Sequence, residues 1–189
     1  MVGRVFPRMK KLLFGLLLVA GALRAEPTVL DLGARGQLTI YLPDGWKVAT
    51  TDMAGQMTVN IDPEDDAINA NCSLIITMPE KDHFDTKSRL KLRVEADCAP
   101  YIEQSVEGKA IAQEFTLTTG FGYYCTFTDP ALRGKPAEKG NFKVLSVGKI
   151  HLAPDVLMDL SIGSEGIREK SYQQLLGAIE GMEYKRGDK

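Results

Sequence analysis

Polar and apolar residues alternate along much of the chain, and this alternation predicts β-strands. Residues 37–42 and 57–61 alternate as half-buried strands do. Between them, residues 43–45 (Pro-Asp-Gly) favour a turn, because proline fixes φ and glycine accepts positive φ, and Trp46 restarts an extended segment. Residues 72–78 are apolar and β-branched with little interruption. That composition predicts a central strand buried on both faces.

A four-residue period follows, and it favours a helix. The apolar positions that carry it are Leu90, Val94, Cys98 and Ile102. They predict a helix over residues 86–106, with Asp85 as its N-cap and Pro100 ending or kinking it. Residues 88–94 also alternate as a strand does. Ala96 and Ala99, which follow, favour a helix over a strand, and we therefore predict a helix.

The second half of the chain predicts two strand pairs and a closing helix. Residues 111–118 and 123–128 flank a glycine-rich turn, and residues 142–150 and 156–162 flank a second turn. An apolar stripe over residues 164–182 predicts an amphipathic helix of about five turns. Short connections between strands favour antiparallel pairing. The chain is therefore predicted to be a single α+β domain, with a largely antiparallel sheet whose faces are covered by two helices.

The first 25 residues are typical of a secretory signal peptide. Residues 1–11 are basic without an acidic residue, residues 12–23 are almost wholly apolar, and small residues follow. The apolar run is shorter than the about 20 residues that span a bilayer. Cleavage after Ala22 or after Ala25 fits the pattern. An uncleaved N-terminal anchor is the alternative.

These features predict a signal peptide at residues 1–25 and a domain at residues 26–189. We expect an exported protein, periplasmic or extracellular, with no membrane span after cleavage. No cysteine follows the apolar run, which disfavours a lipoprotein anchor.

Composition and charge narrow the class of protein. The 189 residues are 44% apolar and 25% charged, which suits one globular domain. Residues 1–25 carry five basic and no acidic residues, so their removal leaves 18 basic and 25 acidic residues and a formal charge of −7. An acidic domain is poorly suited to a phosphate backbone. Nucleic acid is therefore excluded as the main partner.

Three cysteines, Cys72, Cys98 and Cys125, lie in apolar surroundings. Export permits one disulfide, and three pairings are possible with one thiol always left over. Three buried free thiols are the alternative.

Candidate catalytic and metal-binding residues are few. Asp82, His83 and Asp85 are neighbours in a loop and rarely converge on a metal without a scaffold. The acidic residues 62–66 do not begin an EF-hand, because alanine and serine stand where that motif needs glycine and its last ligand. We therefore expect no metal and no cofactor.

Cys125 and His151 lie on neighbouring predicted strands and form the one candidate pair of nucleophile and base. No basic residue stands beside Cys125 in the sequence to stabilise its thiolate. We expect no catalytic residues and no enzyme activity, and a Cys/His-based enzyme is the least favoured alternative.

The order of elements, together with two short stretches of sequence, resembles the Mog1/PsbP-like fold group. The first stretch is Leu-Pro-Asp-Gly-Trp at residues 42–46, and the second is Gly-Tyr-Tyr at residues 122–124, followed by Phe-Thr-Asp at residues 127–129. This group includes exported bacterial members of unknown function. The resemblance implies an α/β/α sandwich around an antiparallel sheet. It also implies action through partners, since the group shares no catalytic motif.

The most favoured function is binding of an unidentified protein partner in the cell envelope. Recognition tends to lie on loops held by a rigid sheet, and residues 62–66 and 129–141 form the candidate loops. The candidate contact residues are Asp62, Glu64, Asp65, Asp66, Arg133, Lys135 and Lys139. The alternative function is carriage of a small apolar ligand between sheet and helix, lined by Phe115, Phe127 or Tyr123. The sequence leaves the partner and the oligomeric state open.

Overall fold

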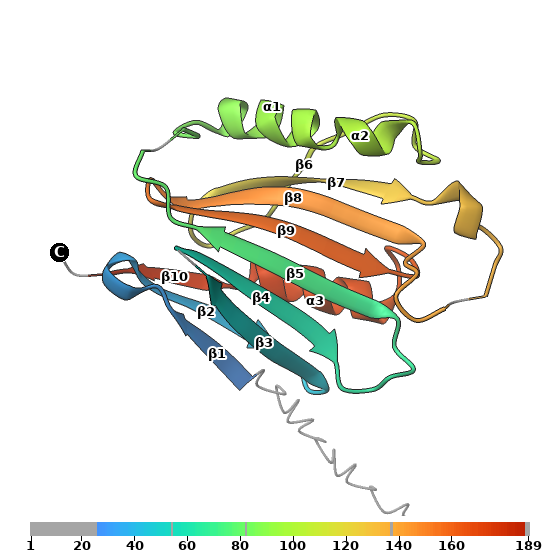
Figure 1. Ribbon diagram of the computed structural model, residues 1–189, viewed down its shortest axis with the longest axis horizontal. Coiled ribbons are helices and arrows are strands. Elements are labelled where there is room, and N and C mark those ends of the chain that lie inside the picture. Colours follow the sequence, from blue (N-terminus) through green and yellow to red (C-terminus); the bar gives the residue numbers. More distant parts are fainter. Residues whose placement is uncertain (1–25, 54, 82, 137, 188–189) are drawn as a thin grey trace, which may run out of the picture.

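The computed structural model describes residues 26–53, 55–81, 83–136 and 138–187. Its main feature is a seven-stranded sheet in which every neighbouring pair is antiparallel (Figure 1). In spatial order the strands are β3 (Trp46–Met53), β4 (Gln56–Pro63), β5 (Ala70–Thr77), β9 (Val156–Ser164), β8 (Val144–Ala153), β7 (Phe121–Thr128) and β6 (Gln113–Glu114). The predicted signal peptide and both cleavage sites lie outside the described residues.

A second, three-stranded sheet and one helix pack on one face of the large sheet. The small sheet has the order β1 (Glu26–Asp31), β2 (Gly36–Leu42) and β10 (Glu183–Arg186). Helix α3 (Lys170–Glu180) contacts β2, β5 and β9. Leu38, Leu74 and Ile179 are fully buried together in this main core. Burial of such apolar side chains contributes about 1.5–3 kcal/mol each.

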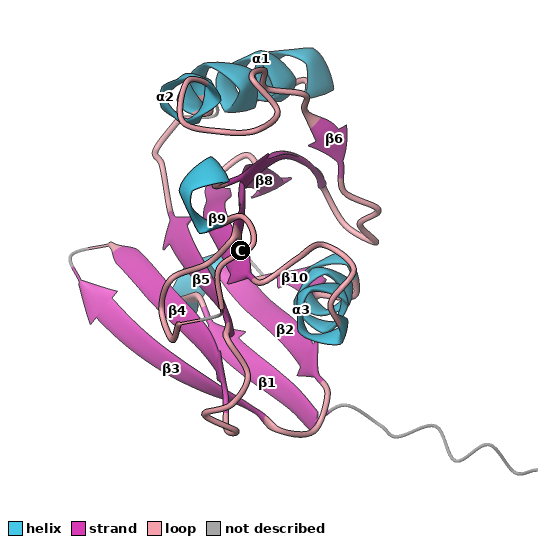
Figure 2. Cartoon of the chain, turned by 90° about the vertical axis from the view of Figure 1, so that its right-hand side faces the viewer, coloured by secondary structure: helices cyan, strands magenta, loops and turns pink. Residues whose placement is uncertain are grey.

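The opposite face carries α1 (Lys87–Asp97) and α2 (Ala99–Ile102), which lie over β7 and β8 (Figure 1). Figure 2 shows these helices well apart from α3, with strands of the large sheet between them. A second apolar cluster joins α1 to β7 through Leu90, Val94, Tyr123 and Phe127. The predicted α+β class, with one largely antiparallel sheet flanked by helices, is therefore confirmed. Among the described residues, no helix combines the length and the apolar character that crossing a membrane requires.

Helices α1 and α2 cover only the β7–β8 side of their face. Strand β5 is central, as predicted, but only one of its faces is fully buried, because the helices do not extend over it. On its other face Ser73 lies between Asn60 and Ser161 in one row of half-buried polar side chains. The predicted burial of this strand on both faces is therefore wrong.

The first helix differs from its prediction in cap and length. Its N-cap is Thr86 rather than Asp85, because the extended Thr86 accepts the backbone N–H of Arg89 at 3.3 Å. Asp85 instead forms an ion pair with Arg89 at 2.8 Å. The helix ends at Asp97, and Pro100 lies in the first turn of α2, where no backbone donor is needed. The chain does not continue as helix to residue 106.

The second half also differs at its boundaries. The closing helix is shorter than predicted, because Ser164 is the last residue of β9 and its hydroxyl donates to the carbonyl of Gly166 at 3.2 Å. The predicted strand 111–118 contracts to Gln113–Glu114. The turn at residues 43–45 is confirmed, with Gly45 at φ 85°.

Candidate functional site

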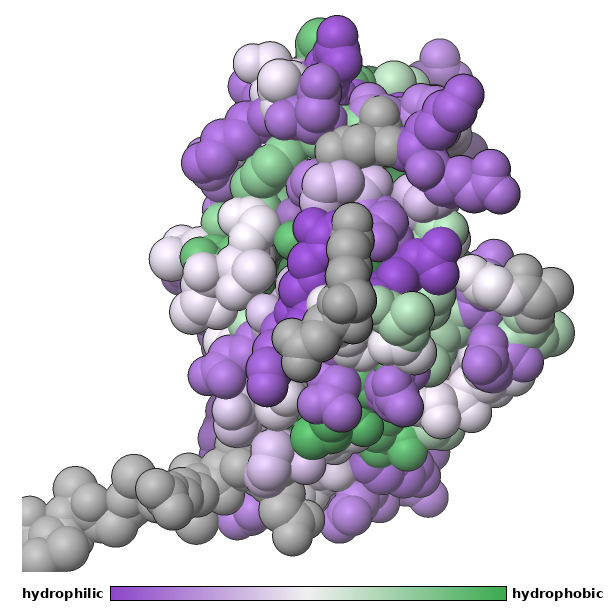
Figure 3. All heavy atoms as spheres, turned by 90° about the vertical axis from the view of Figure 1, so that its left-hand side faces the viewer, coloured by the Kyte–Doolittle hydropathy of each residue, from purple (hydrophilic) through white to green (hydrophobic). Residues whose placement is uncertain are grey.

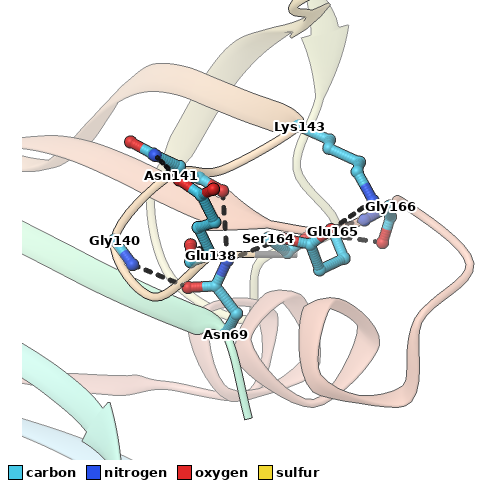
Figure 4. Close-up of polar contacts among 8 residues, drawn as sticks. All are labelled: Asn69, Glu138, Gly140, Asn141, Lys143, Ser164, Glu165 and Gly166. Carbon is cyan, nitrogen blue, oxygen red and sulfur yellow. Dashed lines mark hydrogen bonds and ion pairs between the residues drawn. The ribbon is translucent and has the colours of Figure 1, made fainter. Parts of the chain in front are cut away.

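The side-chain amide of Asn69 joins three segments that are far apart in the sequence (Figure 4). Its Nδ2 donates to the carbonyls of Glu138 at 3.0 Å and Asn141 at 3.1 Å, and to Oε1 of Glu165 at 2.6 Å. Its Oδ1 accepts the backbone N–H of Gly140 at 2.9 Å. Asn69 therefore fixes the segment before β5 against the loop before β8 and the residues after β9.

Neighbouring contacts reinforce this arrangement. Asn141 donates its backbone N–H to the carbonyl of Glu138 at 2.9 Å and its Nδ2 to the Glu138 carboxylate at 3.0 Å. Lys143 forms an ion pair with Glu165 at 2.7 Å. We call residues 64–69 together with residues 129–136 and 138–141 the loop surface. Its first part overlaps the predicted acidic loop, residues 62–66, only at residues 64–66, and its second part lies within the predicted loop 129–141. Contacts of Asn69 and of Asp66 join the two parts.

The predicted contact residues do not all lie in one place. Asp66 and Lys139 form an exposed ion pair across the two loops. Asp65 is exposed, and its Oδ1 accepts the backbone N–H of Ala67 at 2.9 Å, which holds the turn. Glu64 is exposed beside it.

The other three candidates lie outside this network. Asp62 is not a loop residue, because it belongs to β4, is half-buried and pairs with Lys47 in the β3–β4 register. Arg133 and Lys135 are exposed just after the short 3₁₀ helix η2 (Pro130–Leu132), in the part of the loop before residue 137. Only part of the predicted contact set therefore gathers around Asn69.

A hollow of about 470 Å³ opens beside Asn69, and we call it the acidic hollow. It lies between the turn before β3, the loop surface and the start of α3. The charged side chains around it are Asp44, Asp65, Glu165, Glu169 and Lys170, four carboxylates and one cation. Trp46 and Ile68 supply apolar surface to it. Sequence reasoning missed this site, because its residues come from four separate segments.

Exposed apolar side chains are scattered over the described surface. The large ones are Val29, Met53, Leu92, Tyr101, Val106, Ile111 and Ile167. Figure 3 shows one face of the molecule, covered mostly by hydrophilic side chains with small hydrophobic patches between them. Single exposed apolar residues are normal on soluble proteins. Charge is therefore the more distinctive feature of the described surface.

A second pocket, of about 300 Å³, lies between α1–α2 and the strands β5, β9 and β8. Ile75, Val94 and Tyr101 form part of its apolar wall. Its polar centre is Lys149, which is 8% exposed and forms ion pairs with Asp159 and, at 3.8 Å, with Asp97. Burial lowers the pKa of Lys149, and the nearby Asp97 carboxylate opposes that effect.

The prediction that Phe115, Phe127 or Tyr123 lines a ligand pocket is wrong. Phe115 packs against Tyr124 in the main core, with ring centroids 4.5 Å apart. Tyr123 and Phe127 are buried in the α1 cluster, where Phe127 stacks on Tyr101 at 5.4 Å. None of the three expected residues lines the pocket.

The sequence did carry one signal for this pocket. Lys149 and Asp159 are charged residues inside otherwise apolar strands, and the pairing of β8 with β9 places them directly opposite each other. Cross-strand pairs of opposite charge are a recognised element of sheet structure.

The structure contradicts the pairing of Cys125 with His151. Cys125 lies opposite Val147, whereas His151 lies opposite Phe121 and stacks on its ring at 4.9 Å. The register therefore separates the two groups by four residues along the strands, roughly 13 Å. A thiol and an imidazole at that separation cannot exchange a proton directly.

The weak metal candidate has no support in the part of the chain that the structure describes. Asp82 lies outside the described residues, and Asp85 is paired with Arg89. Within the described ranges, no group of three or more His, Cys, Asp or Glu side chains is arranged to hold a metal ion.

Comparison of the chain with protein families and with curated proteins found no match. A search of solved structures returned the Ran-binding protein Mog1p of Saccharomyces cerevisiae, with 19% sequence identity and a TM-score of 0.44. The alignment covers 84% of this chain and 95% of Mog1p. At this TM-score the likeness says nothing of the partner or the chemistry of this chain.

Proposed function

We propose that the protein is an exported domain without catalytic activity, which binds a protein partner of the cell envelope at the loop surface and the acidic hollow. The observation that carries this proposal is the hollow itself. Four carboxylates surround an apolar patch formed by Trp46 and Ile68, and Asn69 fixes one side of the rim. Such a site suits a basic segment of a folded or extended partner.

The chemistry of the hollow favours a lysine or arginine side chain as its occupant. The alkyl stem of either residue packs on apolar surface while its charged end reaches a carboxylate. Trp46, which is 9% exposed, contributes part of the apolar lining of the hollow. Lys170 at the hollow and Lys143, which forms an ion pair with Glu165, offset only part of the negative charge. After removal of residues 1–25 the formal charge of −7 attracts a basic partner over longer distances.

The Asn69 contacts also prepare the loops for binding. Ordering a flexible side chain at an interface opposes association by about 0.5–1.5 kcal/mol. Because Asn69 already holds the segment around residues 138–141, less of this free energy is lost on binding. A rigid rim of this kind favours recognition of one partner shape.

A pair of matched charge reversals tests the proposal. Asp44 lines the hollow and Asp52 lies near the far end of β3, and both are exposed. The tagged protein and the variants Asp44→Lys and Asp52→Lys are used to capture proteins from an envelope extract. We expect the wild type and Asp52→Lys to recover the same partner in similar amounts, and Asp44→Lys to recover less than half as much. Equal recovery by both variants would contradict the proposal.

The pocket beneath α1 supports a second candidate function, the carriage of a small molecule. Apolar walls from Val94 and Ile75 surround the Lys149–Asp159 pair, so a ligand with an apolar body and one polar group suits it. Native mass spectrometry of the protein purified from its own cells tests this. A reproducible added mass that is reduced in Val94→Trp supports carriage, and a bare chain mass contradicts it.

A further inference from the structure

Two of the three cysteines meet where α1 lies on the large sheet. Cys98 follows the last residue of α1, Cys125 lies in the middle of β7, and both are fully buried. Both side chains belong to the apolar cluster that joins α1 to β7. Independently, Sγ of Cys98 lies 3.8 Å from the carbonyl oxygen of Val147, which is the residue directly opposite Cys125 in the β7–β8 register. Both observations place the two cysteines side by side.

The third cysteine lies on the other face of the sheet. Strand register places Cys72 in one row with Ser146 and Thr126, and Thr126 is the neighbour of Cys125 in the chain. Neighbouring residues of a strand point to opposite faces. The Ser146 hydroxyl bonds to the Tyr172 hydroxyl of α3 at 2.7 Å, so this row faces α3 and not α1. Cys72 is therefore separated from the other two thiols by the sheet.

We propose that Cys98 and Cys125 are a redox pair that forms an intrachain disulfide by exchange with a small disulfide oxidant, such as glutathione disulfide. One cysteine thiolate attacks the oxidant, whose S–S bond breaks and releases one glutathione thiolate. The second cysteine loses its proton and attacks the mixed disulfide, which releases the second glutathione. Two protein thiols are thereby oxidised while one glutathione disulfide is reduced to two thiols.

Burial decides when this exchange takes place. Because both thiols are fully buried in the folded protein, this exchange takes place while the chain folds, before α1 covers β7.

The disulfide would tie the end of α1 to the sheet beside the pocket. Cys98 itself lines that pocket together with Lys149 and Tyr101. Oxidation would therefore fix one wall of the pocket, and reduction would leave that wall held by apolar packing alone. An exported protein meets the oxidising conditions in which such a bond persists.

Peptide mapping of the refolded protein tests the pairing. The full chain is reduced, unfolded and refolded in a glutathione redox buffer, and its free thiols are then alkylated under denaturing conditions. We expect non-reducing digestion to yield a peptide pair joined through Cys98 and Cys125, with Cys72 alkylated. Three alkylated cysteines, or a bridge that includes Cys72, would overturn the proposal.

Single variants provide the matched controls. Cys72→Ser should still form the bridge, whereas Cys98→Ser and Cys125→Ser should each leave two alkylated cysteines. The Tm of the wild type should fall when dithiothreitol is added, and the Tm of Cys98→Ser should not respond. A redox-dependent Tm in Cys98→Ser would also contradict the pairing, and the wild-type peptide map decides the matter if a variant does not fold.

Discussion

Asp66 and Lys139 lie 73 residues apart in the sequence and form an ion pair that joins the two loops of the loop surface. The Lys139 ammonium lowers the pKa of the Asp66 carboxyl by hydrogen bonding and by its charge. Both side chains are nonetheless exposed, and exposed ion pairs contribute little to stability because solvent and salt screen them. The Asn69 contacts therefore carry most of the attachment between the loops.

Replacement of Asn69 by alanine tests whether the Asn69 contacts, rather than the Asp66–Lys139 ion pair, hold the two loops together. Asn69→Ala removes four hydrogen bonds, including one to the Glu165 carboxylate, and leaves backbone groups of residues 138–141 without those partners. We expect the free energy of unfolding to fall by about 2 kcal/mol. Urea denaturation at neutral pH measures the change. As a control, Lys139→Ala should leave it nearly unchanged, and an equal loss in both variants would contradict this account of the loops.

Two glycines, Gly148 on β8 and Gly177 on α3, should respond oppositely to a single added methyl group. At Gly148 on β8 a Cβ would lie 2.6 Å from the carbonyl oxygen of Tyr123 and 2.7 Å from Cβ of Tyr124, so β8 must move away from β7. Gly148→Ala should lower the free energy of unfolding by about 2 kcal/mol. At Gly177 on α3 nothing lies within 4 Å of that position.

Gly177→Ala is thus the matched control, and it should raise the free energy of unfolding by up to about 1 kcal/mol, since alanine favours helix. Thermal unfolding followed by circular dichroism compares the two variants. A stabilising Gly148→Ala would show that β7 and β8 are not packed as closely as described.

Glu107 links acid stability to the segment that follows α2. Burial acts to raise the pKa of Glu107, but hydrogen bonds from the Thr128 N–H at 2.8 Å and the Thr128 hydroxyl at 2.7 Å outweigh it and hold that pKa below 4.5, its ordinary value. The contribution of Glu107 to stability is therefore present above that pH and is lost as the pH falls through the lowered pKa.

Glu107→Gln should flatten this part of the acid response. Urea midpoints measured from neutral pH down to about pH 3 should fall less steeply for Glu107→Gln than for the wild type. Glu103→Gln, at an exposed carboxylate of the same segment, serves as control. If both variants follow the wild-type curve, the hydrogen bonds from Thr128 do not lower the pKa of Glu107 in solution.

The spacing of apolar residues predicted the larger helices and strands, because burial of one face of an element requires that spacing. The spacing of Leu90, Val94 and Cys98 favoured a helix over the competing alternation of residues 88–94, and these three side chains are the ones that α1 and its C-cap bury against β7. Boundaries depend on single contacts instead. Thr86 rather than Asp85 caps the helix, because only one of the two neighbours has the geometry that reaches the Arg89 N–H.

Features without local periodicity were missed. Strand β10 is the charged tetrapeptide Glu183–Arg186, and it is extended because it pairs with β2. The acidic hollow brings Asp44, Asp65 and Glu169 together from three parts of the chain. The Asn69 contacts are mostly to backbone groups, which any sequence offers, so composition alone gives no sign of them. Such sites become visible only once the strands are paired.

The most direct measurement of the central claim uses Trp46, the one tryptophan of the chain, which lines the acidic hollow. Protein labelled with fluorotryptophan gives a single fluorine NMR resonance, and the captured, unlabelled partner is added to it. We predict that the resonance shifts on binding in the wild type and in Asp52→Lys, and that Asp44→Lys needs a higher partner concentration for the same shift. A partner that binds while the Trp46 resonance stays unchanged would contradict the claim that the hollow is the binding site.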